Sequence, residues 1–524
     1  MQIRDAGLPN LVKFGKWTYQ MNVFRFELIM SKKVKISLQP LGKLISVNPG
    51  TPLIDVLHEF GVEFPCGGKG TCGRCKVKLL QGELQADAAQ QKKLDKLKLG
   101  KDWRLACFCR AESDITIEIA QFEDIILADN STFSFNPKDG FGIAVDVGTT
   151  TLVAQLLDLK TGRLLDAATA VNPQVKFGAD LISRIQSCLD GKQPEMQQLI
   201  REKTGKLIQN ILEKHRVEIS KVVLVGNTVM HHVFSGLNVQ PLSFYPFESP
   251  DLGMQKFLPE KLKWKIPRNT EIRFYPSIGS FVGSDILAGI AATNMAEKEN
   301  FSILIDLGTN GEIVLGNRDR IICASTAAGP AFEGAKISQG MRAVTGAVSS
   351  IQLESEKMNC HVIGNVPAKG ICGSGLIDAM AVLLQHEKIG MFGEINSGEE
   401  KIELTKNIFL TQQDIREFQL AKAAIAAGLQ ILLNQFKISF NEVENVFIAG
   451  GFGNFLNLKH VIQTGLIETS EEKIIKMGNT ALIGAKMFLF ENDSSVQHIL
   501  EKTSHINLEA NPDFQDIYVE KLMM

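Results

Sequence analysis

The cysteines of this chain are unevenly distributed. Five of the nine, Cys66, Cys72, Cys75, Cys107 and Cys109, lie within residues 66–109. The first three share one loop, with five residues and then two between the thiols, and 31 residues separate Cys75 from Cys107. An odd number of cysteines in a chain that keeps its thiols reduced favours metal ligation over disulfides. The clustering therefore predicts a metal centre in this part of the chain.

The loop that carries these thiols is rich in glycine and positively charged. It reads Cys66-Gly-Gly-Lys69-Gly-Thr-Cys72-Gly-Arg74-Cys75. Three thiolates on one loop with a distant fourth is a ligand pattern of 2Fe–2S clusters. Glycines let the backbone wrap such a compact anion closely, with N–H groups turned toward sulfur. A structural zinc site is the alternative, although zinc favours two Cys-x-x-Cys pairs.

The fourth ligand is one of two neighbouring thiols. Cys107 stands in Arg104-Leu-Ala-Cys107, whereas Cys109, two residues later, competes with it and is expected to be a buried small hydrophobe. The five-residue gap and the Arg-Leu-Ala-Cys context resemble the adrenodoxin-like branch of the 2Fe–2S ferredoxins over residues 34–120. This resemblance implies a β-grasp ferredoxin domain in which Cys66, Cys72, Cys75 and Cys107 hold the cluster.

Two short motifs far apart in the chain combine an aspartate with a Gly-Thr turn. A buried strand ends at Asp146 and turns through Gly-Thr-Thr-Thr, and the same plan returns 160 residues later as Asp306-Leu-Gly-Thr-Asn-Gly. Such a turn presents a carboxylate, hydroxyls and backbone N–H groups, the set that holds a phosphate and its magnesium. The repeat predicts two similar α/β lobes. The alternative is a pair of ordinary hairpins, since Asn-Gly is itself a good hairpin signal.

A third motif, Val446-Phe-Ile-Ala-Gly-Gly-Phe-Gly-Asn454, runs from a buried strand into a glycine cluster. The three motifs together resemble the superfamily of actin, sugar kinases, acetate kinases and the large heat-shock chaperones. The resemblance implies two ribonuclease-H-like lobes that clamp ATP and Mg²⁺. It places Asp146, Gly148, Thr149, Thr150 and Thr151 in a first phosphate turn, Asp306, Gly308, Thr309, Asn310 and Gly311 in a second, and Gly450, Gly451 and Gly453 beside adenosine.

The catalytic groups of this clamp are less well specified. Asp146 and Asp306 are expected beside the metal and phosphates, and Glu312 or Glu333 is the candidate to orient the attacking water. No carboxylate typical of sugar kinases is identifiable, which argues against sugar transfer. His231 and His232 point about 100° apart on a helix, so a core or interface role is favoured over metal ligation.

The elements that must position these residues divide the chain into five parts. We expect an N-terminal extension at 1–29, the ferredoxin-type domain at 30–120, a polar linker at 121–139, a first ATPase-like lobe at 140–298 and a second lobe at 299–524. The fold class is α+β and α/β multidomain. Thr411 with Asp414 predicts a capping box that opens a helix reaching Phe436.

Composition excludes several other classes of protein. Lys and Arg number 56 against 58 Asp and Glu, a net charge of −2, so no global field attracts nucleic acid. No apolar run is long enough to span a membrane, and no signal peptide is recognisable, so we expect a cytoplasmic protein without a membrane partner.

The pairing of a ferredoxin domain with an ATP clamp resembles the reductive activators of corrinoid proteins. The motifs that carry this resemblance are Gly226-Asn-Thr-Val-Met-His-His, Asp306-Leu-Gly-Thr-Asn-Gly-Glu, Ala328-Gly-Pro-Ala-Phe-Glu-Gly-Ala and Gly370-Ile-Cys-Gly-Ser-Gly-Leu, within residues 34–490. The resemblance implies transfer of one electron from the cluster to a Co(II) corrinoid protein of a methyltransferase system, restoring Co(I), with ATP as the energy source.

The same resemblance implies a low-potential electron donor and a homodimer.

Two other functions remain open from the sequence alone. One is a small-molecule kinase whose ferredoxin domain senses redox state, which phosphate transfer to a substrate would reveal. The other is a non-catalytic, chaperone-like protein whose ATP-gated binding to a partner would survive loss of the cluster.

The purified protein should be brown and contain one 2Fe–2S cluster, because four thiolates fill the ligand positions that two irons require. Single Ala substitutions at Cys66, Cys72, Cys75 and Cys107 should each lose or destabilise the cluster, whereas Cys109→Ala should retain it. Iron, sulfide and zinc analysis with visible absorption checks this. One zinc and no sulfide in the parent protein would refute the assignment.

Overall fold

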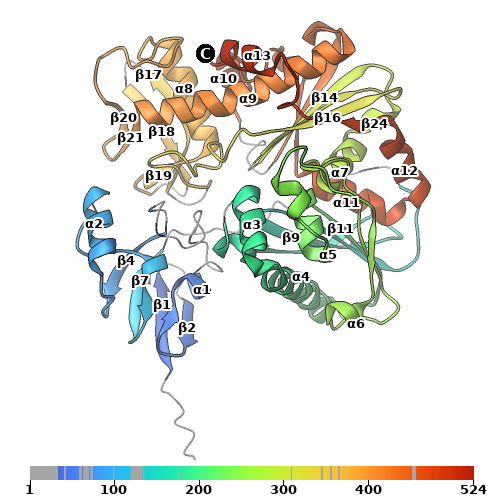
Figure 1. Ribbon diagram of the computed structural model, residues 1–524, viewed down its shortest axis with the longest axis horizontal. Helices are drawn as coiled ribbons and strands as arrows, with labels where there is room; N and C mark the ends of the chain where they lie inside the picture. Colours follow the sequence, from blue (N-terminus) through green and yellow to red (C-terminus); the bar gives the residue numbers. More distant parts are fainter. Residues whose placement is uncertain are drawn as a thin grey trace, which may run out of the picture.

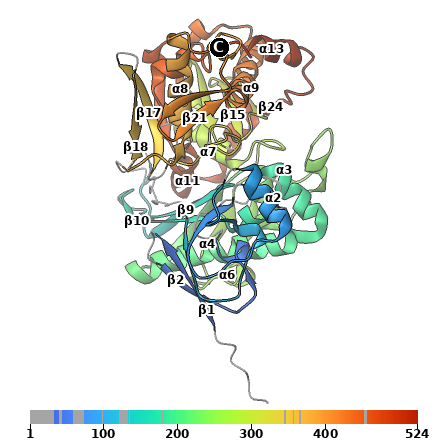
Figure 2. The same ribbon diagram turned by 90° about the vertical axis from the view of Figure 1, so that its left-hand side faces the viewer.

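The computed structural model of the 524-residue chain describes residues 33–39, 43–57, 62, 70, 73, 75–97, 99–119, 133, 135–178, 180–308, 310–343, 346–354, 357–363, 366–450 and 456–524. These residues form a small β-rich domain beside two larger lobes (Figure 1). In the side view the small domain lies in front of the lower lobe and lower than β17 and β18 of the upper one (Figure 2).

The small domain is built on a mixed five-stranded sheet in the order β2-β1-β7-β4-β5. Strands β1 and β7 are parallel, and the other neighbours are antiparallel. This is the expected β-grasp ferredoxin fold. Its elements are β1 Val34–Gln39, β2 Lys43–Val47, β3 Thr51–Pro52, α1 Ile54–Leu57, β4 Lys76–Gln81, α2 Ala88–Lys96, β5 Trp103–Leu105, β6 Arg110–Ala111 and β7 Ile115–Glu118.

The lower lobe contains a six-stranded sheet in the order β10-β9-β8-β11-β13-β12. Strands β8, β9 and β10 form an antiparallel meander, and β11 and β13 run parallel to β8. The elements are β8 Phe141–Val147, β9 Thr151–Asp158, β10 Leu164–Val171, α3 Leu181–Ser187, α4 Gln193–His215, β11 Ile219–Val225, α5 Thr228–Ser235, β12 Gln255–Phe257, α6 Pro259–Leu262, β13 Glu271–Phe274 and α7 Ser284–Thr293.

The upper lobe repeats this topology in its sheet β23-β22-β14-β15-β16-β24. Strands β14, β15 and β16 form the meander, and β22 and β23 run parallel to β14. The main elements are β14 Phe301–Leu307, β15 Gly311–Gly316, β16 Ile321–Thr326, α8 Gly373–Gln385, α9 Gln412–Phe436, β22 Val443–Ala449, α10 Leu458–Gln463, β23 Ile474–Gly478, α11 Thr480–Phe490, α12 Asp493–Lys502, β24 Thr503–His505 and α13 Phe514–Glu520. The repeat inferred from the two aspartate motifs is therefore a repeat of the fold.

Small additional sheets extend the upper lobe on the side that faces the ferredoxin domain. They consist of β17 Ala347–Glu354, β18 Lys357–Val362, β19 Gly370–Ile371, β20 Lys401–Thr405 and β21 Ile408–Thr411. An ion pair joins this side to the small domain, with 3.7 Å between Lys369 Nζ and Glu118 Oε1. Helix α9 follows directly and opens with the predicted capping box of Thr411 and Asp414.

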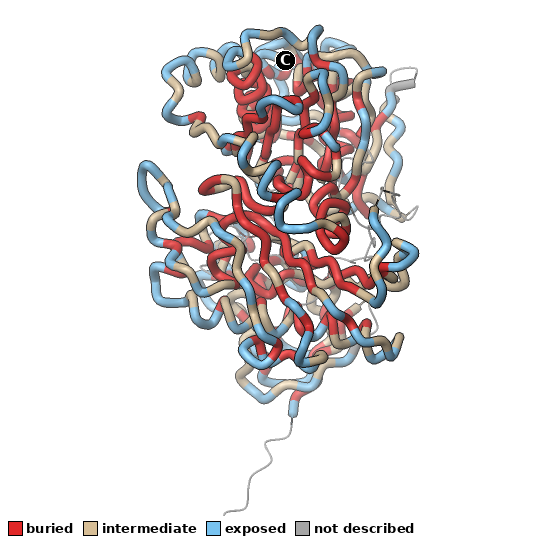
Figure 3. Tube along the Cα trace, turned by 90° about the vertical axis from the view of Figure 1, so that its right-hand side faces the viewer, coloured by how far each residue is buried: buried red, intermediate tan, exposed pale blue. Residues whose placement is uncertain are grey.

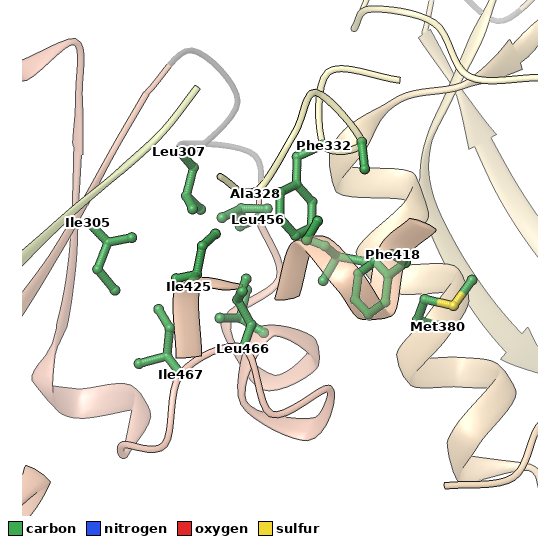
Figure 4. Close-up of a cluster of buried hydrophobic side chains, with 14 of the residues drawn as sticks. Ile305, Leu307, Ala328, Phe332, Met380, Phe418, Ile425, Leu456, Leu466 and Ile467 are labelled. Atoms are coloured by element: carbon green, nitrogen blue, oxygen red, sulfur yellow. The ribbon is translucent and has the colours of Figure 1, made fainter. Parts of the chain in front are cut away.

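The apolar core of the upper lobe lies between its sheet and helices α8 and α9 (Figure 4). Ile305 and Leu307 come from β14, Ile425 and Phe418 from α9, and the rings of Phe332 and Phe418 meet edge to face at 5.8 Å. Buried residues follow the central strands of both lobes (Figure 3). In the part of the chain that the structure describes, no helix is both long enough and apolar enough to cross a bilayer.

The two lobes are joined by a reciprocal exchange of helices. Helix α7 follows the last parallel strand of the lower lobe, yet its Ile286 and Ile290 pack against Leu304 in the sheet of the upper lobe. Helix α11 follows the corresponding strand of the upper lobe, yet its Leu482 packs against Val223 in the lower sheet. Helix α11 therefore covers the sheet of the other lobe, whereas α7 lies between the two sheets, since its Leu287, Ala288 and Ala291 also belong to the apolar cluster of the lower sheet.

The two exchanged helices cross through glycines. A Cβ atom on Gly484 of α11 would lie 2.0 Å from the carbonyl oxygen of Ala288 in α7, and one on Gly289 would lie 2.8 Å from Leu304 Cδ2. A backbone carbonyl at 2.0 Å leaves no room for a methyl group, so the close approach of α7 and α11 depends on the missing side chain of Gly484. Gly289 instead makes room for Leu304 of β14.

Gly484→Ala should destabilise the lobes by about 1–3 kcal/mol, the usual cost of inserting a methyl group into a packed interior. The gain in helix propensity opposes this loss but does not remove the clash with Ala288. Urea unfolding followed by circular dichroism measures the effect. Gly253→Ala is the control, because its nearest atom beyond its neighbours is 3.7 Å away. Equal stability of the two variants would contradict this account of the crossing.

Candidate functional site

Two of the four predicted cluster ligands are brought together in the ferredoxin domain. Cys75 directly precedes β4, Cys107 lies on the short helix Ala106–Phe108, and their Sγ atoms are 3.3 Å apart. The backbone holds this arrangement, since the N–H of Ala106 donates to the carbonyl of Cys75 at 2.8 Å. Cys66 and Cys72 lie outside the described residues. The geometry supports the two ligands that it includes.

Two glycines of the cysteine loop adopt a backbone conformation that residues with side chains disfavour. Gly70 and Gly73 adopt φ values of +69° and +67°, where side chains are strained. A Cβ on Gly70 would also lie 2.4 Å from the ring of Phe108. Lys93 donates to the carbonyl of Gly70 and brings a cation to the loop. Gly70 therefore lies directly against the helix that carries Cys107.

Cys109 has the surroundings of a core residue. It is 3% exposed, and its thiol lies 3.5 Å from the carbonyl of Leu105 and 3.7 Å from Gln90 Oε1. Burial raises the pKa of Cys109 to about 11, so the thiolate that ligates iron is disfavoured there. This supports Cys107 as the fourth ligand.

The first phosphate turn joins β8 to β9 near the N-terminus of α11. Asp146 lies near the end of β8, and its Oδ2 accepts a hydrogen bond of 2.8 Å from Asn479 Nδ2. Asn479 is the N-cap residue of α11, so this bond comes from the other lobe. Asn227, the N-cap of α5, donates to the hydroxyl of Thr149 at 2.8 Å.

The second turn joins β14 to β15 in the equivalent place. Its Gly308 N–H donates to the carbonyl of Asn310 at 3.0 Å, and Gly311 leaves no space for a side chain, since a Cβ there would lie 2.7 Å from Thr326 Oγ1. Asp306 and Glu312 are paired across the hairpin. Thr309 lies outside the described residues.

The predicted adenosine motif begins beside the second aspartate. Gly450 follows β22 with φ +100°, and a Cβ there would lie 2.3 Å from the carbonyl of Leu307 and 3.1 Å from Asp306 Oδ1. Gly226 follows the equivalent strand β11 and approaches Val147 in the same way, at 2.6 Å. Gly451 and Gly453 lie outside the described residues. A glycine after the fourth strand of each lobe thus lets the backbone approach the turn.

A further carboxylate, which the sequence did not single out, completes the site. Asp285 lies in the first turn of α7, and the charges that most influence it are those of Asp306 and Asp146. Asp285 comes from the lower lobe and faces the upper one, just as Asn479 comes from the upper lobe and binds Asp146. The exchanged helices therefore each deliver an N-terminal polar group to the aspartates of the turns.

The carboxylates in this cluster have pKa values above the ordinary range. Burial raises the pKa of Asp146 to about 6, although the bond from Asn479 opposes the shift. Burial, then the charges of Asp146 and Glu333, raise the pKa of Asp306 to about 7. Burial, then the charges of Asp306 and Asp146, raise the pKa of Asp285 to about 8. Without a cation, the cluster retains protons near neutral pH.

Glu312 is the most deeply placed member of the cluster. It is 8% exposed, and burial followed by the charges of Asp285 and Asp306 raises its pKa well above the ordinary range. A hydrogen bond from Asn310 opposes that shift. A divalent cation between these groups would favour their ionised forms, because an opposite charge lowers carboxylate pKa values.

The donor set fits a loosely held magnesium ion better than a closed metal cage. Among the described residues, no three His, Cys, Asp or Glu side chains lie close enough to hold a metal ion by themselves. Mg²⁺ commonly takes one or two carboxylates and completes its octahedron with waters and phosphate oxygens. Asp146, Asp285 and Asp306 remain partly accessible to the cleft and are suited to that role.

The adjacent histidines lie in the core of the lower lobe. His231 and His232 are both buried in α5, where Phe274 packs edge to face on His231 and Ser249 bonds to His232. Burial lowers the pKa of His231 to about 4. This agrees with the core role that the helical spacing predicted.

Comparisons with known proteins match the whole arrangement. Residues 36–112 match the family described as the 2Fe-2S iron-sulfur cluster binding domain. Residues 141–298 match the RACo middle region, and residues 300–524 match the C-terminal domain of RACo, the ASKHA domain.

Individual relatives extend over most of the chain. The "Corrinoid activation enzyme RamQ" of Eubacterium limosum is 33% identical over 444 residues, which are 76% of this chain and 74% of that protein. The Co(II) methylated amine-specific corrinoid protein reductase of Methanosarcina barkeri is 27% identical, covering 73% and 76%. The solved structure of a "Reductive activator for corrinoid,iron-sulfur protein" matches with a TM-score of 0.66 and 27% identity, covering 94% of this chain and 98% of that one.

The nucleotide-free and metal-free protein should lose stability as pH rises from about 5.5 to 8.5. The folded-state pKa values of Asp146, Asp306 and Asp285, about 6, 7 and 8, lie above the ordinary value of 3.8. The folded state therefore binds more protons than the unfolded state in this range, and the stabilisation is lost through these pKa values. Thermal unfolding in a chelator measures the slope.

Asp285→Asn should flatten this slope and raise the unfolding temperature at pH 8.5, because it removes the group with the highest of the three values. Asp319→Asn, on a side chain that is 79% exposed, is the control and should leave the slope unchanged. A stability that rises with pH, or that Asp285→Asn does not alter, would contradict the proton-retaining cluster.

Proposed function

The chain belongs to the RACo family, and on that premise we propose that it is an ATP-dependent reductive activator of corrinoid proteins. It transfers one electron from a 2Fe–2S cluster to a Co(II) corrinoid protein and restores the Co(I) form needed for methyl transfer. The names of its relatives support this: one is a corrinoid activation enzyme and another a reductase of a Co(II) corrinoid protein. They favour an activator over the kinase and the chaperone-like protein.

The ferredoxin domain is the electron carrier. Cys66, Cys72, Cys75 and Cys107 hold the cluster, which supplies one electron at a time when bound. The convergence of Cys75 and Cys107 at 3.3 Å supports this ligand set. Lys93, which donates to the carbonyl of Gly70, contributes positive charge beside an anionic centre.

The cleft between the lobes is the ATP site. The first turn, Gly148 to Thr151, and the second, Gly308 to Gly311, hold phosphates, and Gly450, Gly451 and Gly453 line the adenosine side. Asp146 and Asp306 would hold Mg²⁺, with Asp285 beside them. Glu312, which is paired with Asp306 across the hairpin, would orient the water that attacks the terminal phosphate.

The observation that carries the proposal is the reciprocal delivery of Asp285 and Asn479 to the aspartates of the two turns. Because the cluster of polar groups draws on both lobes, a ligand that binds it favours one relative position of the lobes. Reduction of Co(II) corrinoid lies below ordinary ferredoxin potentials and needs a second source of free energy. ATP binding and hydrolysis supply it through this coupled movement.

The remaining partners follow from the same chemistry. The electron donor is a carrier of low potential, since the cluster must be reduced before it can reduce cobalt. We propose a homodimer and a cytoplasmic location. A reducing compartment keeps thiols such as Cys188, Cys323 and Cys360 free, and the structure contains them as free thiols.

A reconstituted assay tests the proposal. A Co(II) corrinoid protein of the same organism, a titanium(III) reductant, this protein and Mg-ATP should together yield Co(I), followed by the corrinoid absorption spectrum. Cys75→Ala should hydrolyse ATP yet reduce no cobalt. Asp146→Ala should keep a reducible cluster yet hydrolyse ATP at least about 100-fold more slowly and produce no Co(I).

These separated defects are expected only if the two modules are coupled. Arg318→Ala, on a half-exposed side chain of the upper lobe, is the control and should behave as the parent protein. Reduction at the parent rate without ATP, or parent-rate hydrolysis by Asp146→Ala, would refute the proposal.

A further inference from the structure

Three successive carbonyl groups of the first phosphate turn accept hydrogen bonds from donors that lie behind the turn. The carbonyl of Gly148 accepts from Asn172 Nδ2 at 2.8 Å, that of Thr149 from Arg184 Nη2 at 2.5 Å, and that of Thr150 from the N–H of Asn172 at 2.8 Å. All three donors lie on the side of η3 Pro173–Lys176 and α3, behind the turn.

Because the peptide bond is planar and trans, these hydrogen bonds determine where the N–H groups of the turn point. In each peptide unit the N–H points away from the carbonyl that precedes it. Because the carbonyls of Gly148 and Thr149 are drawn backward, the N–H groups of Thr149 and Thr150 are turned forward. The described residues supply no acceptor for either N–H. Successive N–H groups that share a direction form an anion-binding concavity.

Arg184 is the charged residue among the donors behind the first turn. Its side chain is fully buried, and beyond Thr149 it donates to the carbonyl of Gly178 at 3.0 Å and to Gln174 Oε1 at 3.4 Å. No carboxylate in the described part of the chain lies within ion-pair distance of it. A buried guanidinium without a counter-charge is costly, and burial lowers the pKa of Arg184 to about 9.

No comparable set of hydrogen-bond donors lies behind the second turn in its described part. Its Gly308 N–H is satisfied within the turn by the carbonyl of Asn310, and the carbonyl of Gly311 accepts from the hydroxyl of Thr326. Its charged neighbours are the carboxylates of Asp306 and Glu312. Both turns therefore have an aspartate beside them, Asp146 and Asp306, but in the described residues only the first turn is backed by a buried guanidinium.

From this contrast we infer that Arg184 is the positioning residue of an anion site at the first turn: it aims the N–H groups of Thr149 and Thr150 at a phosphate group of the nucleotide, whose charge balances its own. The inference rests on the proposed ATP site and deepens it. The backbone N–H groups of the first turn recognise the polyphosphate chain, while the carboxylates of Asp146 and Asp306 are left to the cation.

The geometry also explains why arginine stands at this position. The planar guanidinium bonds at once to the carbonyls of Thr149 and Gly178, which come from different segments, and so fixes the turn against η3 and α3. A lysine ammonium would keep the charge but not the forked geometry. Charge and geometry can therefore be separated by substitution.

Binding of ATP and of adenosine to the cluster-loaded protein, measured by calorimetry without Mg²⁺, tests the inference. Arg184→Gln should weaken ATP binding by about 10- to 100-fold, the range for a hydrogen bond to a charged group. It should leave adenosine affinity within about 2-fold, because adenosine has no phosphate. Arg184→Lys should fall between the parent and Arg184→Gln for ATP and match the parent for adenosine.

Arg201→Gln is the matched control. Arg201 lies in the same lobe and bonds to the carbonyl of Phe234 at 2.7 Å, remote from the turn. The Arg201→Gln substitution should lower the unfolding temperature and leave the affinities for ATP and adenosine unchanged. Amide hydrogen exchange of the segment 148–152 provides a second readout, since ATP should protect Thr149 and Thr150 in the parent protein and in Arg201→Gln but not in Arg184→Gln.

The outcomes distinguish this inference from the proposed function. If the parent protein binds no ATP, the ATP site itself is refuted. If the parent binds ATP and Arg184→Gln binds it equally well, or loses ATP and adenosine in equal proportion, the positioning role is refuted and Arg184 is structural. If Arg184→Gln does not fold, Arg184→Lys decides by the same ratio of ATP to adenosine affinity.

Discussion

The crossing of α7 and α11 is the contact on which the rest of the site depends. Helix α11 covers the sheet of the other lobe, α7 lies between the two sheets, and the two helices approach within backbone contact at Gly484 and Ala288. This crossing aims the N-terminus of one helix at Asp306 and that of the other at Asp146. A single packing contact thereby unites two duplicated halves into one polar centre, which neither half forms alone.

The sequence predicted what is local and missed what depends on this crossing. Asp146 and Asp306 were recognisable because each ends a buried strand before a Gly-Thr turn, and Cys107 was recognisable from its neighbours. Asp285 and Asn479 carry only a weak signal, a polar residue at the start of a helix, which usually marks a cap and not a site. Arg184 has no signal of its own, because its role comes from three carbonyl partners brought together by tertiary structure.

Three half-buried carboxylates and the buried Glu312 would repel one another in a resting protein if all were ionised. Retained protons relieve the repulsion near neutral pH, and a cation with its phosphates can replace those protons. Each turn has an aspartate beside it, but the guanidinium of Arg184 adds a positive charge behind the first turn alone among the described residues. The two turns therefore present different fields to a nucleotide, which favours one orientation of its phosphates.

The C-terminal end of helix α11 makes a second set of contacts. The ring of Phe490, the last residue of the helix, packs on Phe133 and Phe135 at 5.6 and 4.6 Å, and Lys138 bonds to the carbonyl of Leu489. In the sequence these residues lie between the ferredoxin domain and the first strand of the lower lobe. The same helix, about 16 Å long at 1.5 Å per residue, thus binds Asp146 through Asn479 at one end and holds the segment that enters the lower lobe at the other. Any displacement of α11 along its axis would therefore move Asn479 and this entry segment together.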